Sequence, residues 1–550
     1  MWKRNKIPCY NKTMIEERNL PIGIQDFEKL RNFDNVYVDK TRLIWDMVKT
    51  GTPYFLSRPR RFGKSLLLST IKAYFLGKKE LFKDLAIEKI EEEHAALKNR
   101  KPWQVYPIIQ FDLNSAKYSE PNALSVILDS KLCEYEDLYG ITKKAKSLSQ
   151  RFERLLKAIH EKTGFQSVIL VDEYDKPLLE VLDDEAVFED NRQTLKSFFG
   201  VLKSEDAHIR FSFLTGVTKF SQVSVFSDLN NLKDISMDKR FSTLCGISES
   251  ELTDIFTPEI ERLAESKNLT KDECIGKLKS MYDGYHFSQN SEGVYNPFSL
   301  LNAFDSQTFE SFWFKTGTPS FLVKAMQKAD FDVKEMEEGV SVLNEEFSEY
   351  RFNYQSIIPL LYQSGYLTIK DYDSSFGTYT LTFPNHEVKY GFLNFLMPLS
   401  LNFEKGVTGA FYVKKFIEDL NSCSVDDFMT RIKSLLSAVP YNVYGEKQTV
   451  TEQTFQTGIF LIFQLMGQFV QVEIQSAKGR ADCVVKTKNA VYVFEFKLKG
   501  TAQEALEQIE SKDYAIPYSA EKADGKKLIK IGVGFEKEIP VIKEWIVKEI

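Results

Sequence analysis

The chain has 550 residues, of which 43% are apolar and 13% aromatic, and its net charge is −6 at neutral pH. This length is too great for one ordinary domain and predicts roughly three or four. The negative charge excludes nucleic-acid binding by overall electrostatic attraction, so such binding would need a local basic patch. The six cysteines form no C-x-x-C pair and the five histidines are dispersed, which excludes a zinc cluster and a disulfide framework. No apolar run approaches the roughly 18 residues of a membrane span and the basic N-terminus lacks a signal core, so we expect a cytoplasmic protein without a membrane partner.

The first predicted elements are a strand, a loop and a helix. An apolar run at 52–57 leads into SRPRRFGKS (57–65), and apolar residues at helical spacing follow. The loop ends like a G-x-x-x-x-G-K-[ST] phosphate-binding loop, although Arg58 stands where the first glycine is expected. Lys64 can neutralise phosphate charge, Ser65 can ligate Mg²⁺, and the helix N-terminus offers free N–H groups. We therefore predict nucleotide contacts at Arg61, Phe62, Gly63, Lys64, Ser65 and Leu66.

Three further strands are predicted at 105–113, 167–175 and 209–219, with helical segments between them. Alternating strands and helices predict an α/β fold with a parallel sheet, as in a P-loop ATPase core. The second of these strands ends in Asp172 and Glu173, at the sheet edge where ligands bind. Asp172 would hold Mg²⁺ and Glu173 would act as general base. A strand that simply ends in polar residues is the alternative, but the combination with the loop favours a nucleotide site.

Two threonines end the strand at 209–219. In ATPases of this topology, a polar residue at this position senses the γ-phosphate, so that Thr215 and Thr218 are both candidates. A threonine-rich strand end without this role is an equally good interpretation. The arginines of the loop, Arg58, Arg60 and Arg61, either add cationic contacts to the nucleotide or face outward and hold a partner or nucleic acid.

The loop, VILVDEYDKPL, FLTGVTKFS, LNNLKDIS and YDGYHF together resemble the AAA-ATPase-like family of bacterial proteins, over about residues 18–300. In that family RPRRFGKS is the usual form of the loop. The resemblance implies an ATP-binding P-loop core, and leaves open whether ATP is hydrolysed.

The middle of the chain predicts packing elements. The aromatic segment YDGYHF at 282–287 favours a packed junction between the ATPase core and a helical lid, with a functional role as the alternative. Residues 354–384 read as a helix followed by a hairpin, which is a winged-helix-like pattern, but residues 354–366 carry no lysine or arginine. A lid-like role is therefore favoured over DNA reading. We expect four domains: an ATPase domain (18–240), a helical lid (241–330), a winged-helix-like domain (331–438) and a C-terminal domain (439–550).

The C-terminal domain carries a second candidate site. The helix at 451–467 has Glu452 on its apolar stripe, and a carboxylate there is costly unless it binds something. Strand alternation in AVYVFEFKLKG puts Glu495 and Lys497 on one face. Asp482 and Glu495 can share a Mg²⁺ ion, Lys497 can orient or deprotonate a water, and Glu452 can add a ligand. The alternative is a solvated strand face with an ordinary Glu–Lys pair.

This region, about 440–545, resembles the PD-(D/E)XK nuclease superfamily and implies a restriction-endonuclease-like α/β domain. The resemblance assigns the core motif to Asp482, Glu495 and Lys497, and supporting positions to Glu452 and Gln508. The sequence thus predicts an ATPase that regulates a Mg²⁺-dependent nuclease acting on DNA. One alternative is a nucleotide-dependent sensor or scaffold whose C-terminal domain binds nucleic acid or a partner without cleavage. Another is an autonomous nuclease with a vestigial ATPase domain. Assembly as a homo-oligomer stays open.

Overall fold

The computed structural model describes residues 18–115, 117–142, 147–219, 231–315, 322, 333–344, 357–401, 409–437, 452–467, 470–474, 481–523, 525–536 and 542–550. The chain forms two compact units: the first lies within residues 1–331 and 339–387, and the second within 332–338 and 388–550. In the parts of the chain given above, no helix combines the length and the apolar character that crossing a bilayer requires.

A five-stranded sheet forms the centre of the first unit. Its strand order is β2-β3-β4-β1-β5, and every neighbouring pair is parallel. The strands are β1 (Tyr54–Ser57), β2 (Ile108–Asp112), β3 (Ser167–Asp172), β4 (Ile209–Gly216) and β5 (Lys233–Asp234). The predicted parallel α/β sheet is thereby confirmed. Because β4 alone separates β1 from β3, the loop after β1 and the carboxylates after β3 lie at the same edge.

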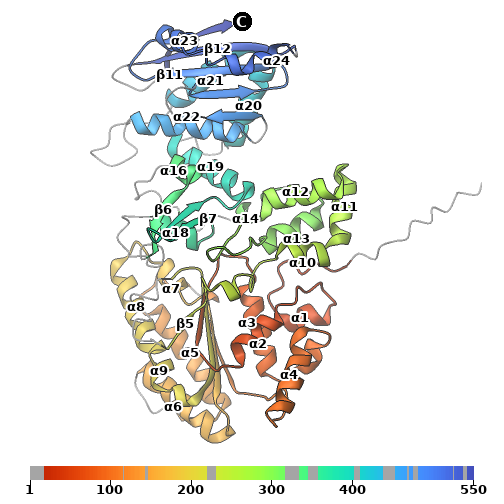
Figure 1. Cartoon of the computed structure of the whole chain (residues 1–550). Coiled ribbons are helices and arrows are strands. Elements are labelled where there is room, and N and C mark those ends of the chain that lie inside the picture. Colours follow the sequence, from red (N-terminus) through yellow and green to blue (C-terminus); the bar gives the residue numbers. More distant parts are fainter. Residues whose placement is uncertain are drawn as a thin grey trace, which may run out of the picture. The chain divides into compact units, whose positions relative to one another are not determined.

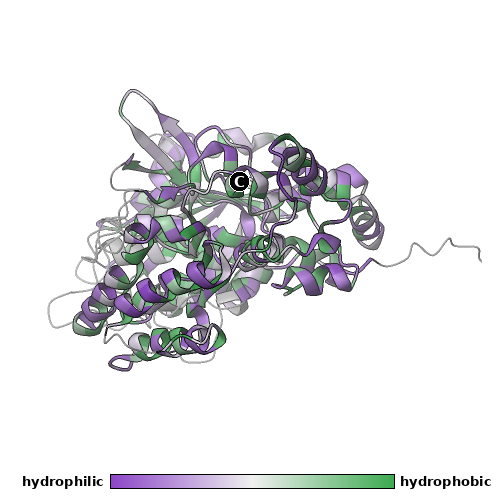
Figure 2. Cartoon of the chain, turned by 90° about the horizontal axis from the view of Figure 1, so that it is seen from below, coloured by the Kyte–Doolittle hydropathy of each residue, from purple (hydrophilic) through white to green (hydrophobic). Residues whose placement is uncertain are grey.

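Helices cover both faces of this sheet (Figure 1). One group consists of α1 (Phe27–Asn32), α2 (Thr41–Val48), α3 (Lys64–Phe75) and α4 (Ala86–Leu97). The other consists of α5 (Ala123–Leu138), α6 (Leu148–Thr163), α7 (Lys176–Leu179), α8 (Glu185–Phe199) and α9 (Val201–Ser204). The local sequence accounts for α6: Ser147 caps its first turn and Gly164 ends it in the left-handed region. Figure 2 shows hydrophilic and hydrophobic residues alternating around the helices, as expected for amphipathic elements.

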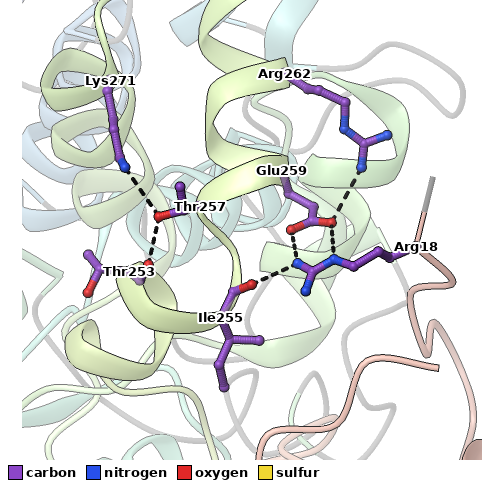
Figure 3. A network of polar contacts seen from close by, with 7 residues as sticks. All are labelled: Arg18, Thr253, Ile255, Thr257, Glu259, Arg262 and Lys271. Carbon is purple, nitrogen blue, oxygen red and sulfur yellow. Dashed lines mark hydrogen bonds and ion pairs between the residues drawn. The ribbon is translucent and has the colours of Figure 1, made fainter. Parts of the chain in front are cut away.

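A helical region follows the sheet in the first unit. It consists of α10 (Glu249–Ile255), α11 (Thr257–Lys267), α12 (Lys271–Tyr282), α13 (Pro297–Ser306) and α14 (Phe312–Lys315). Capping boxes start α10 and α12. Leu20, Ile22, Val36 and Val38 pack against the apolar core of these helices. Arg18 fixes this N-terminal segment, because it forms an ion pair with the fully buried Glu259 and donates to the Ile255 carbonyl at 2.7 Å (Figure 3).

A small antiparallel sheet completes the first unit. It has the order β6-β8-β7 and consists of β6 (Val340–Leu343), β7 (Thr368–Asp373) and β8 (Thr378–Thr382), with α18 (Ile358–Gln363) before β7. This is the helix and hairpin of the winged-helix-like pattern. Residues 331–438 are expected from the sequence to form one domain; in the structure the sheet belongs to the first unit and the helices after residue 387 belong to the second.

The second unit contains a mixed five-stranded sheet of order β13-β12-β11-β10-β9, in which only β11 and β12 pair in parallel. Its strands are β9 (Gln471–Ile474), β10 (Cys483–Lys486), β11 (Ala490–Lys497), β12 (Lys527–Phe535) and β13 (Ile542–Glu549). Its helices are α16 (Val333–Glu338), α19 (His386–Leu401), α20 (Gly409–Asn421), α21 (Val425–Ser437), α22 (Glu452–Met466), α23 (Ala502–Ser511) and α24 (Ser519–Ala523); α19 begins in the first unit. Helix α23 packs closely on β12 at Gly532, and a Cβ atom at this position would come within 2.3 Å of the Ala502 carbonyl oxygen.

Candidate functional site

Arg58, which replaces the expected first glycine of the loop, lies inside the protein. Only 1% of its surface is exposed. Its guanidinium donates to the carbonyls of Ser57 at 2.9 Å, Ser236 at 2.8 Å and Phe241 at 3.2 Å, and lies 4.0 Å from the centre of the Phe287 ring. Arg58 therefore fixes the loop to later parts of the chain. Of the two roles that the sequence left open for it, the structure supports neither.

The aromatic residues of the middle segment hold the rest of the loop. Phe62 is buried and packs edge-on against Tyr285 and Phe287, with ring centres 4.7 and 5.5 Å apart. The indole nitrogen of Trp313 donates to the Arg60 carbonyl at 3.1 Å. The YDGYHF segment is thus part of a packed junction, as its composition favours. Because the Phe62 ring is engaged in this packing, only the backbone of Phe62 is available for the predicted nucleotide contact.

Lys64, Ser65 and Asp172 meet at the start of α3. The Lys64 ammonium donates to the Arg58 carbonyl at 2.9 Å and the Pro59 carbonyl at 3.1 Å. Ser65 Oγ donates to Asp172 Oδ2 at 2.7 Å. Gly63 has a φ of +88° with open space at its Cβ position, so the turn needs glycine and leaves room for a ligand. The sequence prediction that these residues come together agrees with this geometry.

A tight turn after β3 carries Glu173. This residue has a φ of +50°, which is uncommon outside glycine, and burial raises the pKa of its carboxyl group. The turn is fixed by the Tyr174 amide, which donates to the Thr215 carbonyl at 3.0 Å, and by Asp175. Asp175 accepts from the backbone amide and the hydroxyl of Thr218, at 2.6 and 2.7 Å. Such a set of bonds can hold a strained residue in place.

The two candidate threonines of β4 have different partners. Thr215 Oγ1 donates to Asp172 Oδ1 at 2.5 Å, next to Ser65. Thr218 is fully buried and its hydroxyl is bonded to Asp175. Sequence reasoning missed Asp175, although its position three residues after Asp172 on the turn of VDEYD was a usable signal.

A cavity of about 590 Å³ opens beside the loop. Its lining includes the loop from Arg60 to Leu66 and Glu173, with further polar side chains at Gln25, Lys40, Asn114, Lys176, Glu180 and Asn302. Its apolar lining includes residues that sequence reasoning did not single out, namely Ile22, Ile24, Val36, Val38, Leu244, Ile247, Phe256, Phe298 and Leu301. A cavity lined by both a cationic loop and apolar side chains can hold a ligand with a phosphate group and an apolar body.

In the second unit, Glu495, Lys497 and Gln508 form a connected group. The Lys497 ammonium lies 3.3 Å from Glu495 Oε1 and also donates to Gln508, whose amide in turn donates to Glu495. Asp482 stands at the start of β10, and its Oδ2 accepts from the Phe496 amide at 2.8 Å. Val491 and Val493 pack against α23, and the alternation of β11 puts Glu495 and Lys497 on that same face. The shared face of Glu495 and Lys497 is the one that strand alternation predicts.

The donor set of this group fits a divalent cation. Glu495 is 2% exposed, and its Oε2 is a buried atom without a hydrogen-bond partner in the described structure. Burial and then the Asp482 charge raise the pKa of Glu495, so Lys497 compensates the charge of the ionised form only in part. Among the residues with described placement, no three His, Cys, Asp or Glu side chains gather into a metal group. Glu452 is the first residue of α22, and its side chain lies outside the described part of the chain.

Comparisons with known proteins find a family match in each of the two units. Residues 21–226 match the family described as predicted AAA-ATPase, and residues 450–545 match the PD-(D/E)XK nuclease superfamily. An "Uncharacterized protein in vnfD 5'region" of Azotobacter chroococcum mcd 1 is 33% identical over 546 residues, which cover 98% of this chain and 100% of that protein. The chain belongs to the AAA-ATPase-like family with a C-terminal PD-(D/E)XK nuclease superfamily domain. Both resemblances drawn from the sequence are confirmed.

The AAA-ATPase-like domain implies nucleotide binding. Its matched range includes the loop, Asp172, Glu173 and β4, whereas the cavity lining from 244 to 302 and the residues that hold the loop at 285–313 lie beyond it. Among solved structures, the ORC2 protein of Aeropyrum pernix (ADPNP–ADP complexes) is similar at 13% identity and a TM-score of 0.24, over 66% of this chain and 92% of that chain. A TM-score this low carries no argument, so the fold assignment rests on the strand order and the family matches.

Proposed function

We propose that this protein binds and hydrolyses ATP in its AAA-ATPase-like domain, and that this domain regulates a C-terminal nuclease that hydrolyses DNA phosphodiesters with Mg²⁺. The observation that carries the proposal is the bond of Ser65 to Asp172 next to Lys64, with Lys64, Ser65 and Glu173 lining a cavity that also has apolar side chains in its wall. This arrangement supports a triphosphate beside the loop and a purine base against the apolar part of the lining.

Each residue of the ATPase site has a role that its environment supports. Lys64 would leave the carbonyls of Arg58 and Pro59 to pair with phosphate oxygens. Ser65 and Asp172 would hold the Mg²⁺ that accompanies ATP. Glu173, whose pKa burial raises, would accept the proton of the attacking water, because a carboxylate of higher pKa is the stronger base. Thr215, bonded to Asp172, and Thr218, bonded to Asp175, both remain candidates for sensing the γ-phosphate.

In the second unit, Asp482 and Glu495 would hold Mg²⁺, with Glu452 as a further ligand. When bound there, Mg²⁺ supplies positive charge to the phosphate under attack. Gln508 keeps Glu495 and Lys497 together, and Lys497 would orient or deprotonate the attacking water. The unpartnered Glu495 Oε2 supports this assignment, because a buried carboxylate oxygen is stabilised by a cation.

One observation favours the alternative of a binding module without cleavage. The Lys497 ammonium is already engaged by Glu495 and by Gln508, as in a purely structural Glu–Lys–Gln group. In that case the C-terminal domain would bind nucleic acid or a partner under the control of the nucleotide.

A nuclease assay with Mg²⁺ decides between these functions. Wild type, Lys64→Ala and Asp482→Asn are compared on single- and double-stranded DNA, each with and without ATP, with exposed Lys98→Ala as the matched control. The proposal expects cleavage by wild type that depends on ATP, loss of this dependence in Lys64→Ala and no cleavage by Asp482→Asn. DNA binding without cleavage in wild type supports the alternative.

A further inference from the structure

Trp313 joins the phosphate loop to the end of the first unit through two hydrogen bonds. Its indole nitrogen donates to the Arg60 carbonyl at 3.1 Å, and its backbone amide donates to Glu387 Oε1 at 2.7 Å. Trp313 is 7% exposed and Glu387 is 1% exposed. The bond to Glu387 is buried, where a hydrogen bond is costly to lose, and the bond to the Arg60 carbonyl is partly buried.

Further contacts make this part of the chain the outer support of the loop. Gly365 leaves no room for a side chain, because a Cβ there would come within 2.7 Å of the Pro59 ring. The Trp313 ring packs edge-on against Tyr366 with centres 5.1 Å apart, and Phe62 packs against Tyr285. A displacement of the loop must therefore also displace these residues, since a close-packed interior has no empty space into which the loop could move alone.

Glu387 lies in a buried polar region whose hydrogen bonds are weak. Within the described structure, Glu387 Oε2, Tyr285 OH, Asn296 Nδ2 and Ser299 Oγ have no hydrogen bond of good geometry, although Ser299 lies near enough to Glu387, and Asn296 to Tyr285, to lower the pKa of these groups. Burial raises the pKa of Tyr285 well above its ordinary value and the nearby Glu387 charge adds to this effect. A buried polar group with weak hydrogen bonds is stabilised by any rearrangement that improves them, so this region is suited to more than one set of hydrogen bonds.

Glu387 is also the last residue of the first unit along the chain. Helix α19 begins at His386 and continues to Leu401, and its residues from Val388 onward belong to the second unit. A shift at Glu387 therefore acts on the first turn of the helix that enters the second unit.

We infer that Trp313 and Glu387 position the phosphate loop and transmit its response to nucleotide to the start of α19. The inference rests on the proposed ATP binding. Lys64 now holds the carbonyls of Arg58 and Pro59, which directly precede Arg60. A phosphate that takes up the Lys64 ammonium releases these carbonyls, the Arg60 carbonyl moves with them, and Trp313 carries the movement to Glu387. Trp313 is thus a positioning residue for the ATPase site and a connection to the nuclease domain.

Hydrogen–deuterium exchange on the full-length protein tests this connection, with and without Mg²⁺ and ATP. The variant Trp313→Phe keeps a ring but loses the indole N–H. Trp103→Phe is the matched control, because the Trp103 indole nitrogen is buried and has no partner in the described structure. Glu387→Gln keeps an acceptor for the Trp313 amide, whereas Glu387→Leu removes it.

Without nucleotide, we expect faster exchange at 58–63 in Trp313→Phe than in wild type and in Trp103→Phe. With ATP, we expect altered exchange at 386–401 in wild type, Trp103→Phe and Glu387→Gln, and its loss in Trp313→Phe and Glu387→Leu although calorimetry still detects ATP binding. A wild-type response at 386–401 in Trp313→Phe overturns the inference and leaves the proposed function intact. Absence of ATP binding to wild type overturns both.

Discussion

Ser65 Oγ donates a 2.7 Å hydrogen bond to Asp172 Oδ2 across 107 residues of sequence. Ser65 follows β1 and Asp172 is the last residue of β3, and these strands are not neighbours, since β4 lies between them. Their contact brings the hydroxyl of the phosphate loop to the carboxylate that ends the most buried strand, and Lys64 stands beside them. The predictions for the first unit start from this pair.

Replacing Lys64 by alanine removes the ammonium that now bonds to two loop carbonyls. A charge-assisted contact to phosphate contributes about 1.5–3 kcal/mol, so ATP affinity should fall at least about tenfold. Isothermal titration calorimetry with Mg²⁺ and ATP measures this. Lys98→Ala, an exposed lysine on the same unit, should bind like wild type, and an unchanged affinity in Lys64→Ala would remove Lys64 from the site.

Glu173→Gln should leave ATP binding nearly unchanged and slow hydrolysis. The amide keeps the size of the side chain but cannot accept the proton, and general-base catalysis typically contributes about 10²–10⁴-fold. Phosphate release under single-turnover conditions measures the rate, with the exposed Glu185→Gln as control. Hydrolysis at the wild-type rate would mean that another group is the base.

In the second unit, Mg²⁺ or Mn²⁺ should raise the thermal unfolding temperature, because a cation relieves the repulsion between Asp482 and Glu495. Asp482→Asn should lose both this rise and DNA cleavage. Lys497→Ala should lose cleavage but keep the rise or increase it, because a competing cation is gone. Differential scanning fluorimetry measures the rise, and the exposed Asp427→Asn should match wild type. An equal metal effect in Asp482→Asn would place the cation elsewhere.

Glu387→Gln should make the stability of the protein less dependent on pH. Burial raises the pKa of Glu387 from 4.5 to about 7 in the folded state, so the folded state binds the proton more tightly than the unfolded state. Wild type therefore has its full stability below about pH 4.5 and loses up to about 3 kcal/mol as the pH rises to about 7. The variant should match wild type at pH 4.5–5 and unfold at higher temperature at pH 8. The exposed Glu292→Gln variant should show no such gain. If wild type and Glu387→Gln lose stability equally as the pH rises, ionisation of Glu387 does not destabilise the folded protein.

The positions of the strands, and of the acidic residues at or near their carboxyl ends, could be predicted from local sequence patterns. The apolar run before Asp172 and the alternation around Glu495 each depend on a few neighbouring residues, and both lie as expected. Arg58 could not be predicted in the same way, because the Ser236 and Phe241 carbonyls that bind it lie 178 and 183 residues away. The bond of Thr218 to Asp175 joins two strand ends, and the apolar lining of the cavity joins segments from 22 to 301. Such contacts exist only in the folded chain.

The buried Arg58 has a consequence for how this protein can be divided. A fragment that stops at residue 226, where the AAA-ATPase-like match ends, keeps every residue of the loop but loses Ser236, Phe241 and Phe287. Arg58 would then be a buried guanidinium with the Ser57 carbonyl as its one remaining acceptor among those described, at a cost of several kcal/mol. Transplanting the loop alone into another scaffold would fail for the same reason. The smallest autonomous ATPase piece of this chain should therefore extend through the aromatic segment and the small sheet, to about residue 387.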